Sequence, residues 1–194
     1  MMPEKRYKWR REDYRESTKG LLILNTGDGK GKTTAAIGTM VRAAGRELKC
    51  CMIQFMKSKT DRYGEHESLE KLGIEVYTMG DGFTWDTNDK TQDVKTSEET
   101  WALCLEKMRS RDYELLVFDE LLYVLSYGFL DIDAIIAEIE AIRADQPHLH
   151  IIATGRNVDD ALAKLIDKAD LVTEMREIKH PFNAGIYAQQ GIEF

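Results

Sequence analysis

The chain is poor in cysteine, in long apolar runs and in positive charge, and each shortage excludes a class of protein. Only three of its 194 residues are cysteines, Cys50, Cys51 and Cys104, and no two of them form a C-x-x-C pair. An odd number of thiols without metal-ligand spacing argues against a disulfide framework or a zinc site and favours buried thiols in a reducing cytoplasm. With 34 acidic residues against 27 basic ones, the net charge of -7 excludes a broad electrostatic surface for nucleic acid.

The sequence also lacks segments that would divide it or carry it into a membrane. Hydrophobic residues make up 43% of the chain, but no apolar run approaches the ~18 residues of a membrane span. The first residues are charged where an export signal would be apolar, which predicts a cytoplasmic protein without a membrane partner. Because no Pro/Gly/Ser-rich linker or internal repeat occurs, we expect one α/β domain over residues 20–194, preceded by a charged segment at 1–19.

The strongest positive signal is a glycine-rich run between an apolar stretch and a helical pattern. Its residues are Thr26, Gly27, Asp28, Gly29, Lys30, Gly31, Lys32, Thr33 and Thr34. Glycines let successive backbone N–H groups converge on one anion at a helix N-terminus, where the helix dipole favours negative charge. Lys32 adds a positive charge and Thr33 a hydroxyl for Mg²⁺, as in the G-x-x-x-x-G-K-[ST] loop, although Thr26 replaces the first glycine. The alternative, a Gly/Lys-rich surface turn, does not explain the strand and helix patterns on its two sides.

Strand and helix patterns alternate along the rest of the chain. We expect helices at 34–44, 64–72, 96–109 and along the isoleucine stripe of 132–142, and strands at 21–24, 50–55, 74–77, 115–118, 149–153 and 171–173. Thr96 and Glu99 resemble a capping box that opens the third helix, and residues 79–92 indicate a loop. This order predicts an α/β fold with a P-loop NTPase-like, mostly parallel sheet flanked by helices. Ligands of such folds bind at the carboxyl ends of the strands.

Charged residues follow two of these expected strands, where the ligand should lie. Asp119 and Glu120 follow the strand at 115–118, and in a phosphate-binding fold such acids reach the magnesium of the bound nucleotide. Adjacent acids also occur in solvated turns, but the upstream loop favours a metal site made of Thr33, Asp119 and Glu120. Arg156 closes the next strand and either meets a phosphate or ribose or is an exposed side chain before the next helix.

Five motifs in order resemble one enzyme family. They are the glycine-rich run, G-F-T-W at 82–85, F-D-E-L-L-Y at 118–123, T-G-R at 154–156 and the terminal K-H-P-F-N-A-G-I-Y-A-Q-Q-G-I-E-F. Together they are similar to the P-loop type of ATP:corrinoid adenosyltransferases, which act on cob(I)alamin. The resemblance implies that the Co(I) of a reduced corrinoid attacks the 5′ carbon of ATP, forms an adenosyl–cobalt bond and expels inorganic triphosphate. It also implies a homodimer and a reduced flavoprotein that donates electrons.

The same resemblance implies roles for residues outside the glycine-rich run. Phe83 and Trp85 match aromatic residues that occupy the lower face of the corrin and displace its axial ligand, which eases reduction of Co(II). Without the family they would be ordinary loop anchors. The charged segment 1–19 is implied to fold over the partner subunit's active site, against the alternative of a frayed terminus. Asp28 stands where well-known members have asparagine, so its charge should point away from the triphosphate or be offset by Mg²⁺.

Two other functions are compatible with a phosphate-binding loop. A P-loop ATPase or small-molecule kinase would use Glu120 to position water or an acceptor hydroxyl. A nucleotide-dependent binding module would use the loop as a switch without turnover. The family resemblance favours adenosyl transfer. The residues agree with it, because Co(I) is itself a powerful nucleophile and the sequence shows no signature of an activated Ser, Cys or His.

Overall fold

One parallel sheet organises the chain in the computed structural model, which describes residues 19–80, 90–158 and 160–193. Its strands lie in the order β3-β2-β4-β5-β1-β6, and every neighbouring pair is parallel. Their bounds are β1 Leu22–Thr26, β2 Cys50–Ser58, β3 Glu75–Gly80, β4 Leu115–Asp119, β5 His150–Thr154 and β6 Leu171–Glu174. The α/β fold predicted from the alternating patterns is confirmed.

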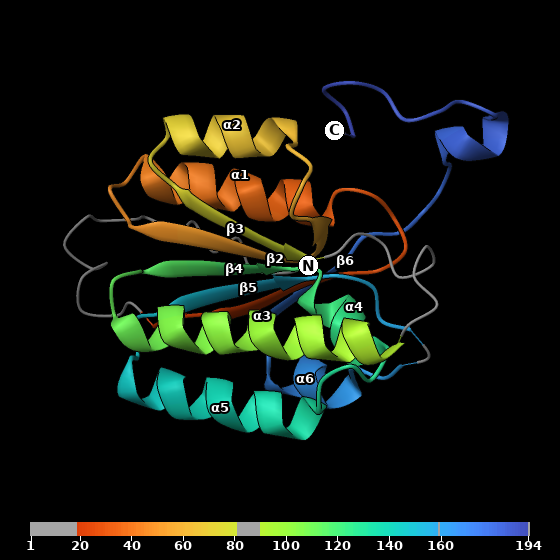
Figure 1. Ribbon diagram of the computed structural model, residues 1–194. Helices are drawn as coiled ribbons and strands as arrows, with labels where there is room; N and C mark the ends of the chain where they lie inside the picture. The colour runs from red at the N-terminus through yellow and green to blue at the C-terminus, as the bar shows by residue number, and fades with distance from the viewer. Residues whose placement is uncertain (1–18, 81–89, 159, 194) are drawn as a thin grey trace, which may run out of the picture.

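Helices cover both faces of this sheet, as parallel strands joined by helical crossovers require (Figure 1). One face carries α1 (Lys32–Ala44) and α2 (Gly64–Lys71), and the other carries α3 (Lys90–Ser110), α4 (Leu121–Ser126), α5 (Ile132–Asp145) and α6 (Ala163–Lys168). After β6 the chain leaves the body of the molecule and forms the short 3-10 helix η2 (Pro181–Ala184). None of the helices in the described ranges has the length and hydropathy that a bilayer crossing requires.

Two apolar cores lie on opposite sides of the sheet. On the α3 and α5 side, Trp101 packs edge-on against Phe118 with 5.9 Å between the ring centroids. On the α1 and α2 side, Met40 and Leu69 are fully buried against the strands. Neighbouring residues of β4 serve the two cores in turn, Val117 the second and Phe118 the first. The strand is therefore apolar from Leu115 to Phe118, because both of its faces are covered.

The third predicted helix starts earlier than its sequence pattern suggested. Residues 79–92 were predicted to form a loop, but β3 extends to Gly80 and α3 begins at Lys90. Thr96 is buried inside this helix, so the predicted capping box is wrong. The hydroxyls of Ser97 and other residues of this stretch donate to backbone carbonyls one turn earlier. Such back-bonding lets hydroxyl residues lie within a helix as well as at its N-cap.

Asp170 lies between α6 and β6 and binds the start of β1. Its carboxylate accepts a hydrogen bond of 2.9 Å from the Leu22 backbone N–H and forms ion pairs with Lys19 and Arg143. Burial raises the pKa of Asp170, but Lys19, the Leu22 N–H and Arg143 outweigh it and hold that pKa at about 2. The ionised carboxylate therefore contributes to the stability of the fold.

Asp170→Asn is expected to lower the free energy of unfolding by about 1 kcal/mol at pH 7, since solvent screens part of the interaction. A depressed carboxyl pKa contributes stability above the unfolded-state value of 3.8 and loses it as the pH falls through about 2. The difference between wild type and variant in urea unfolding should therefore vanish near pH 2. Asp167→Asn, on the exposed side of α6, is the control, and an equal difference at both pH values would contradict this account.

Candidate active site

The glycine-rich loop connects β1 to α1, as the sequence predicted. Gly27 and Gly31 have φ angles of 94° and 110°, in the left-handed region that favours glycine. A Cβ added to Gly27 would lie 2.4 Å from the Met175 carbonyl oxygen, so a side chain has no room there. The helix starts at Lys32, two residues before its predicted start, because Gly31 is the N-cap. Lys32 and Thr33 therefore both lie in the first turn of α1, at the positive end of its dipole.

Lys32 lies across this loop instead of extending into solvent. Its Nζ donates to the carbonyl oxygens of Gly27 and Gly29, at 2.8 Å in both cases, and the residue is 8% exposed. Burial lowers the pKa of Lys32, while the nearby Glu120 raises it and Arg156 lowers it further. The ammonium group is thus held within the loop that the motif assigns to phosphate.

The other polar side chains of the loop differ in burial. Thr26 carries the only buried side-chain oxygen or nitrogen without a hydrogen-bond partner among the described residues. A buried hydroxyl without a partner is costly, so it would gain from a ligand that accepts its hydrogen bond. Asp28 is exposed, which agrees with the expectation that its charge points outward. Lys30 and Thr34 are exposed as well.

The segment after β6 lies against the glycine-rich loop. The Met175 backbone N–H donates to the Thr26 carbonyl, and the Gly29 N–H donates to the Met175 carbonyl, each at 2.7 Å. Near the C-terminus, Glu193 forms an ion pair of 2.9 Å with Lys30. The C-terminal segment therefore contacts the loop at two places that are far apart in the sequence.

Of the two acids predicted for the metal site, Asp119 is the last residue of β4 and Glu120 follows it directly. Asp119 is fully buried, and its Oδ1 accepts hydrogen bonds from Thr33 Oγ1 at 2.8 Å and Thr154 Oγ1 at 2.7 Å. Its Oδ2 accepts a hydrogen bond of 3.1 Å from Gln54 Nε2. These three donors fix the carboxylate beside the first turn of α1. The structure thereby brings Thr33 and Asp119 together, as predicted.

Glu120 turns the chain from β4 into α4 with an unusual backbone conformation. Its φ of 63° lies in the left-handed region, which is uncommon for a residue with a side chain and recurs at functional sites. Burial raises the pKa of Glu120 to about 7, Asp119 adds to the effect, and Lys32 opposes it. Burial and Asp119 therefore disfavour the charged form of this carboxyl, and a nearby cation would stabilise it.

The donor set of Thr33, Asp119 and Glu120 fits a hard divalent cation. All of the donors are oxygen atoms, which Mg²⁺ prefers. No group of three or more His, Cys, Asp or Glu residues that could hold a metal occurs in the described ranges. Mg²⁺ in nucleotide sites characteristically takes one or two carboxylates and completes its shell with water and phosphate oxygens. The residues therefore fit Mg²⁺ that arrives with a nucleotide better than a metal held by the protein alone.

Arg156 follows β5 and remains exposed, as one of its two predicted interpretations required. Its charge nevertheless acts on the site, because it lowers the pKa of both Lys32 and Glu120. Its carbonyl oxygen accepts a hydrogen bond of 3.0 Å from Ser126 Oγ, which ties the turn after β5 to α4. The phosphate or ribose contact of Arg156 stays a prediction.

Sequence reasoning missed two residues that orient Asp119. Gln54 was included in an apolar strand, and Thr154 was noted only as part of a motif. Both are fully buried polar side chains beside apolar residues, Gln54 within β2 and Thr154 at the end of β5, and a polar residue in such a position was the available signal. Buried polar groups in such positions are hydrogen-bonded, so each one points to a partner elsewhere in the fold.

Some predicted site residues lie outside the described ranges. They are Phe83 and Trp85, together with the charged segment 1–19 except Lys19. The corrinoid contacts and the cover over a partner's site therefore stay predictions.

A parallel sheet, a glycine-rich loop after β1 and acids at the carboxyl end of β4 define a protein with the P-loop NTPase-like fold. The flagellar accessory protein FlaH from Methanocaldococcus jannaschii has a similar structure, with a TM-score of 0.55. The match covers 81% of this chain and 71% of that one, at 13% sequence identity, so the likeness concerns the fold alone.

The family of this chain follows from sequence comparison. The family model for ATP:corrinoid adenosyltransferase BtuR/CobO/CobP matches residues 18–194, and the chain belongs to this family. A corrinoid adenosyltransferase of Sinorhizobium sp is 41% identical over 180 residues, which cover 91% of this chain and 81% of that protein. The corrinoid adenosyltransferase of Escherichia coli (strain K12) is 34% identical over an alignment of 204 positions that covers 100% of both chains. The protein is therefore an enzyme, a transferase of the corrinoid adenosyltransferase type.

Proposed function

We propose that this enzyme transfers the 5′-deoxyadenosyl group of MgATP to the Co(I) of a reduced corrinoid and releases inorganic triphosphate. Co(I) donates an electron pair to C5′ of ATP, a cobalt–carbon bond forms, and the bond between C5′ and the triphosphate oxygen breaks. The leaving triphosphate keeps that bonding pair. The observation that supports this reaction best is the meeting of Lys32, Thr33 and Asp119 at the phosphate loop of a member of this family.

In this proposal the chain's main task is to hold the triphosphate. The loop N–H groups and Lys32 stabilise the negative charge that develops as the triphosphate leaves. The Thr26 hydroxyl has no hydrogen-bond partner among the described residues and can donate to a phosphate oxygen. Thr33, Asp119 and Glu120 would hold Mg²⁺, which when bound neutralises phosphate charge.

No side chain of the protein is needed as a nucleophile, because cobalt supplies the electron pair. The chain's thiols agree with this view. Burial raises the pKa of Cys50 to about 11 and that of Cys51 to about 12, and Cys104 is fully buried, so none is a reactive thiolate at neutral pH. All three are free, which also supports our proposal of a cytoplasmic location.

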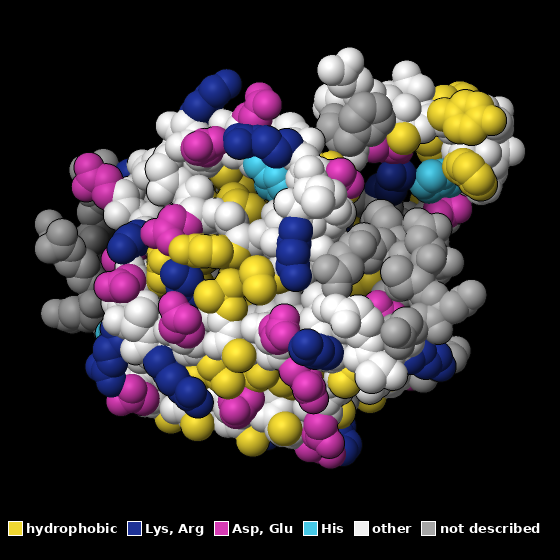
Figure 2. Space-filling model, in the orientation of Figure 1, with side chains coloured by type: hydrophobic (Ala, Val, Ile, Leu, Met, Phe, Trp, Pro, Cys, Tyr) yellow, Lys and Arg dark blue, Asp and Glu magenta, His cyan; other side chains and the backbone are white. Residues whose placement is uncertain are grey.

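We further propose that the enzyme works as a homodimer and receives electrons from a reduced flavoprotein. The family resemblance suggests both partners. The C-terminal segment beyond β6 supports a protein partner, because it carries large exposed apolar side chains, some of which are visible in Figure 2. They are Ile178, Phe182, Ile186, Tyr187 and Ile192, with exposed fractions between 50% and 84%.

Product analysis tests the proposed reaction. Under anaerobic conditions, Co(I)-cobalamin and MgATP should give adenosylcobalamin and triphosphate in equal amounts, followed by the cobalt absorption bands and by chromatography. Omitting the corrinoid should stop the consumption of ATP. Orthophosphate released without a corrinoid would indicate an ATPase, and a phosphorylated acceptor would indicate a kinase; either result would contradict the proposal.

Glu120→Gln is expected to raise the magnesium concentration needed for half-maximal activity about tenfold or more, while corrinoid affinity stays unchanged. The substitution removes an anionic oxygen from a site that should hold a hard cation. A magnesium titration at saturating ATP measures the effect, and Glu67→Gln on the exposed side of α2 serves as control. An unchanged titration would assign the ligand role to Asp119 or to water alone.

A further inference from the structure

A chain of hydrogen bonds runs from Asp119 across the sheet to α2. The parallel register pairs Gln54 of β2 with Asp119 of β4 on one side and with Thr78 of β3 on the other. Gln54 is fully buried, and its Nε2 donates to Asp119 Oδ2 at 3.1 Å. Its Oε1 accepts from Thr78 Oγ1 at 3.1 Å and from His66 Nε2 at 2.7 Å. His66, on α2, is therefore two hydrogen bonds away from the carboxylate of Asp119.

The hydrogen bonds of His66 determine where its proton lies. The backbone N–H of Tyr63, the N-cap residue of α2, donates to His66 Nδ1 at 3.3 Å. A ring nitrogen that accepts a hydrogen bond carries no proton, so the proton of the neutral ring lies on Nε2 and is donated to Gln54. Burial has the largest effect on the ring and lowers the pKa of His66, which favours this neutral form.

This proton selects the orientation of the Gln54 amide. A glutamine amide can exchange the places of its oxygen and nitrogen by a half-turn, and only its hydrogen-bond partners distinguish the two orientations. The Thr78 hydroxyl can donate or accept, so it selects neither. His66 Nε2 only donates and therefore requires the oxygen, which turns the amide nitrogen toward Asp119. Asp119 accepts at that end, so both ends of the chain favour the same orientation.

We propose that His66 is a positioning residue for the triphosphate and magnesium site. Through Gln54 it supplies a fixed donor to Asp119 Oδ2, which leaves Oδ1 facing Thr33. The inference rests on one part of the proposed function, namely that Asp119 helps to hold magnesium. It concerns a residue of α2 that belongs to neither the glycine-rich loop nor the pair of acids at the end of β4.

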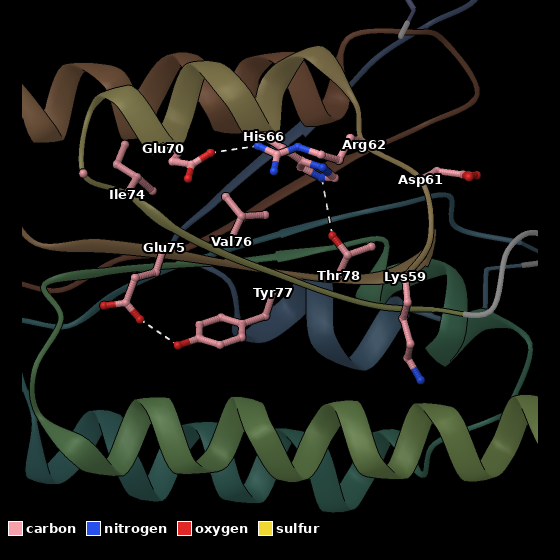
Figure 3. A pocket seen from close by; sticks show the side chains of 11 residues that line it. Lys59, Asp61, Arg62, His66, Glu70, Ile74, Glu75, Val76, Tyr77 and Thr78 are labelled. Carbon is pink, nitrogen blue, oxygen red and sulfur yellow. Dashed lines mark hydrogen bonds and ion pairs between the residues drawn. The ribbon is translucent and has the colours of Figure 1, made fainter.

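In this proposal His66 acts from α2, which packs near the edge strand β3. It lines a groove of about 670 Å³ between α2, β3 and the segment that joins β2 to α2. Figure 3 shows the ring pointing from α2 toward Thr78, whose hydroxyl lies 3.4 Å from His66 Nε2. The ring is therefore placed to act on the site through Gln54 and not through a contact of its own with the phosphate loop.

Binding of Mn²⁺, a spectroscopic substitute for Mg²⁺, tests the proposal without relying on activity. His66→Leu removes the donor and keeps an apolar bulk, and it is expected to weaken Mn²⁺ binding to the ATP complex about tenfold in electron paramagnetic resonance titrations. ATP binding without metal should change less than about twofold. His66→Gln, whose amide nitrogen can take the place of Nε2, should restore Mn²⁺ affinity to within about threefold. The control Glu70→Gln, on α2 and on the same groove, should bind Mn²⁺ like wild type.

The other possible results of these titrations would contradict the role proposed for His66. Unchanged Mn²⁺ affinity in His66→Leu, or a loss that His66→Gln does not restore, overturns the inference. Asp119→Asn separates this failure from that of the proposed function: if it weakens Mn²⁺ binding and His66→Leu does not, only the role of His66 is wrong. If Asp119→Asn also binds Mn²⁺ like wild type, the proposed magnesium site is wrong as well.

A measurement on the wild type removes any dependence on the folding of the variants. Nitrogen-15 NMR at pH 7 should show the proton of His66 on Nε2. A ring with its proton on Nδ1 would contradict the selection of the Gln54 amide and overturn the proposal.

Discussion

Replacing Lys32 with alanine is expected to lower the rate of adenosyl transfer by a factor on the order of 10²–10³. The ammonium group is buried within the glycine-rich loop, between the carbonyl oxygens of Gly27 and Gly29. A charge held there contributes most as negative charge develops on the departing triphosphate, so the chemical step should suffer more than ATP binding. Single-turnover measurements with Co(I)-cobalamin at saturating ATP give this rate directly.

The control for Lys32→Ala is Lys168→Ala. Lys168 lies on α6, and Glu140 is its ion-pair partner among the described residues. Circular dichroism should show that both variants keep the fold. If Lys32→Ala keeps more than about half of the wild-type rate at saturating ATP, the ammonium does not act on the reacting anion, whatever its effect on affinity.

Alanine at Phe83 or Trp85 is expected to reduce activity steeply when the assay starts from Co(II), and much less when it starts from Co(I). If the two aromatic residues exclude the axial ligand, their loss lets water or the corrinoid's own base coordinate cobalt and lowers its reduction potential. A drop of about 59 mV in a one-electron potential reduces the population of Co(I) about tenfold. Parallel assays with a reductant near the potential of a flavoprotein and with chemically prepared Co(I) measure the difference.

Spectroscopy gives an independent check on the two aromatic residues. The Co(II) corrinoid bound with MgATP should be four-coordinate in the wild type and five-coordinate in the alanine variants. Trp85→Phe, which keeps an apolar ring, should behave more like the wild type than Trp85→Ala does. Equal losses from both starting states with unchanged coordination would leave Phe83 and Trp85 as packing residues.

Residue order was enough to predict the parts of the protein that depend on neighbours along the chain. The glycine-rich run predicted the loop because glycine at positions such as Gly27 and Gly31 and a lysine at the helix start are local requirements. Apolar runs bounded by turns predicted the strands of the sheet. The acids at the end of β4 were found because they follow the apolar residues of that strand directly.

Two local patterns gave less information about the helices. Helix α4 was not predicted because Leu121–Ser126 is short and almost wholly apolar, so it has no periodicity that separates a helix from a strand. The start of α3 was misplaced because hydroxyl residues inside a helix resemble an N-cap. The burial of α4 on both sides depends on tertiary packing, and the back-bonding within α3 depends on side-chain conformation. Neither can be deduced from composition.

The residues that surround Asp119 could be identified only from the folded arrangement of the strands. Gln54 and Thr154 are 65 and 35 residues away in the sequence, and the strand order places β2 and β5 on the two sides of β4. His66 joins them because α2 packs over the edge of the sheet next to β3. Side-chain hydrogen bonds between neighbouring parallel strands depend on strand order and register. Both arise from the packing of the whole sheet, so no residue spacing in the sequence reveals them.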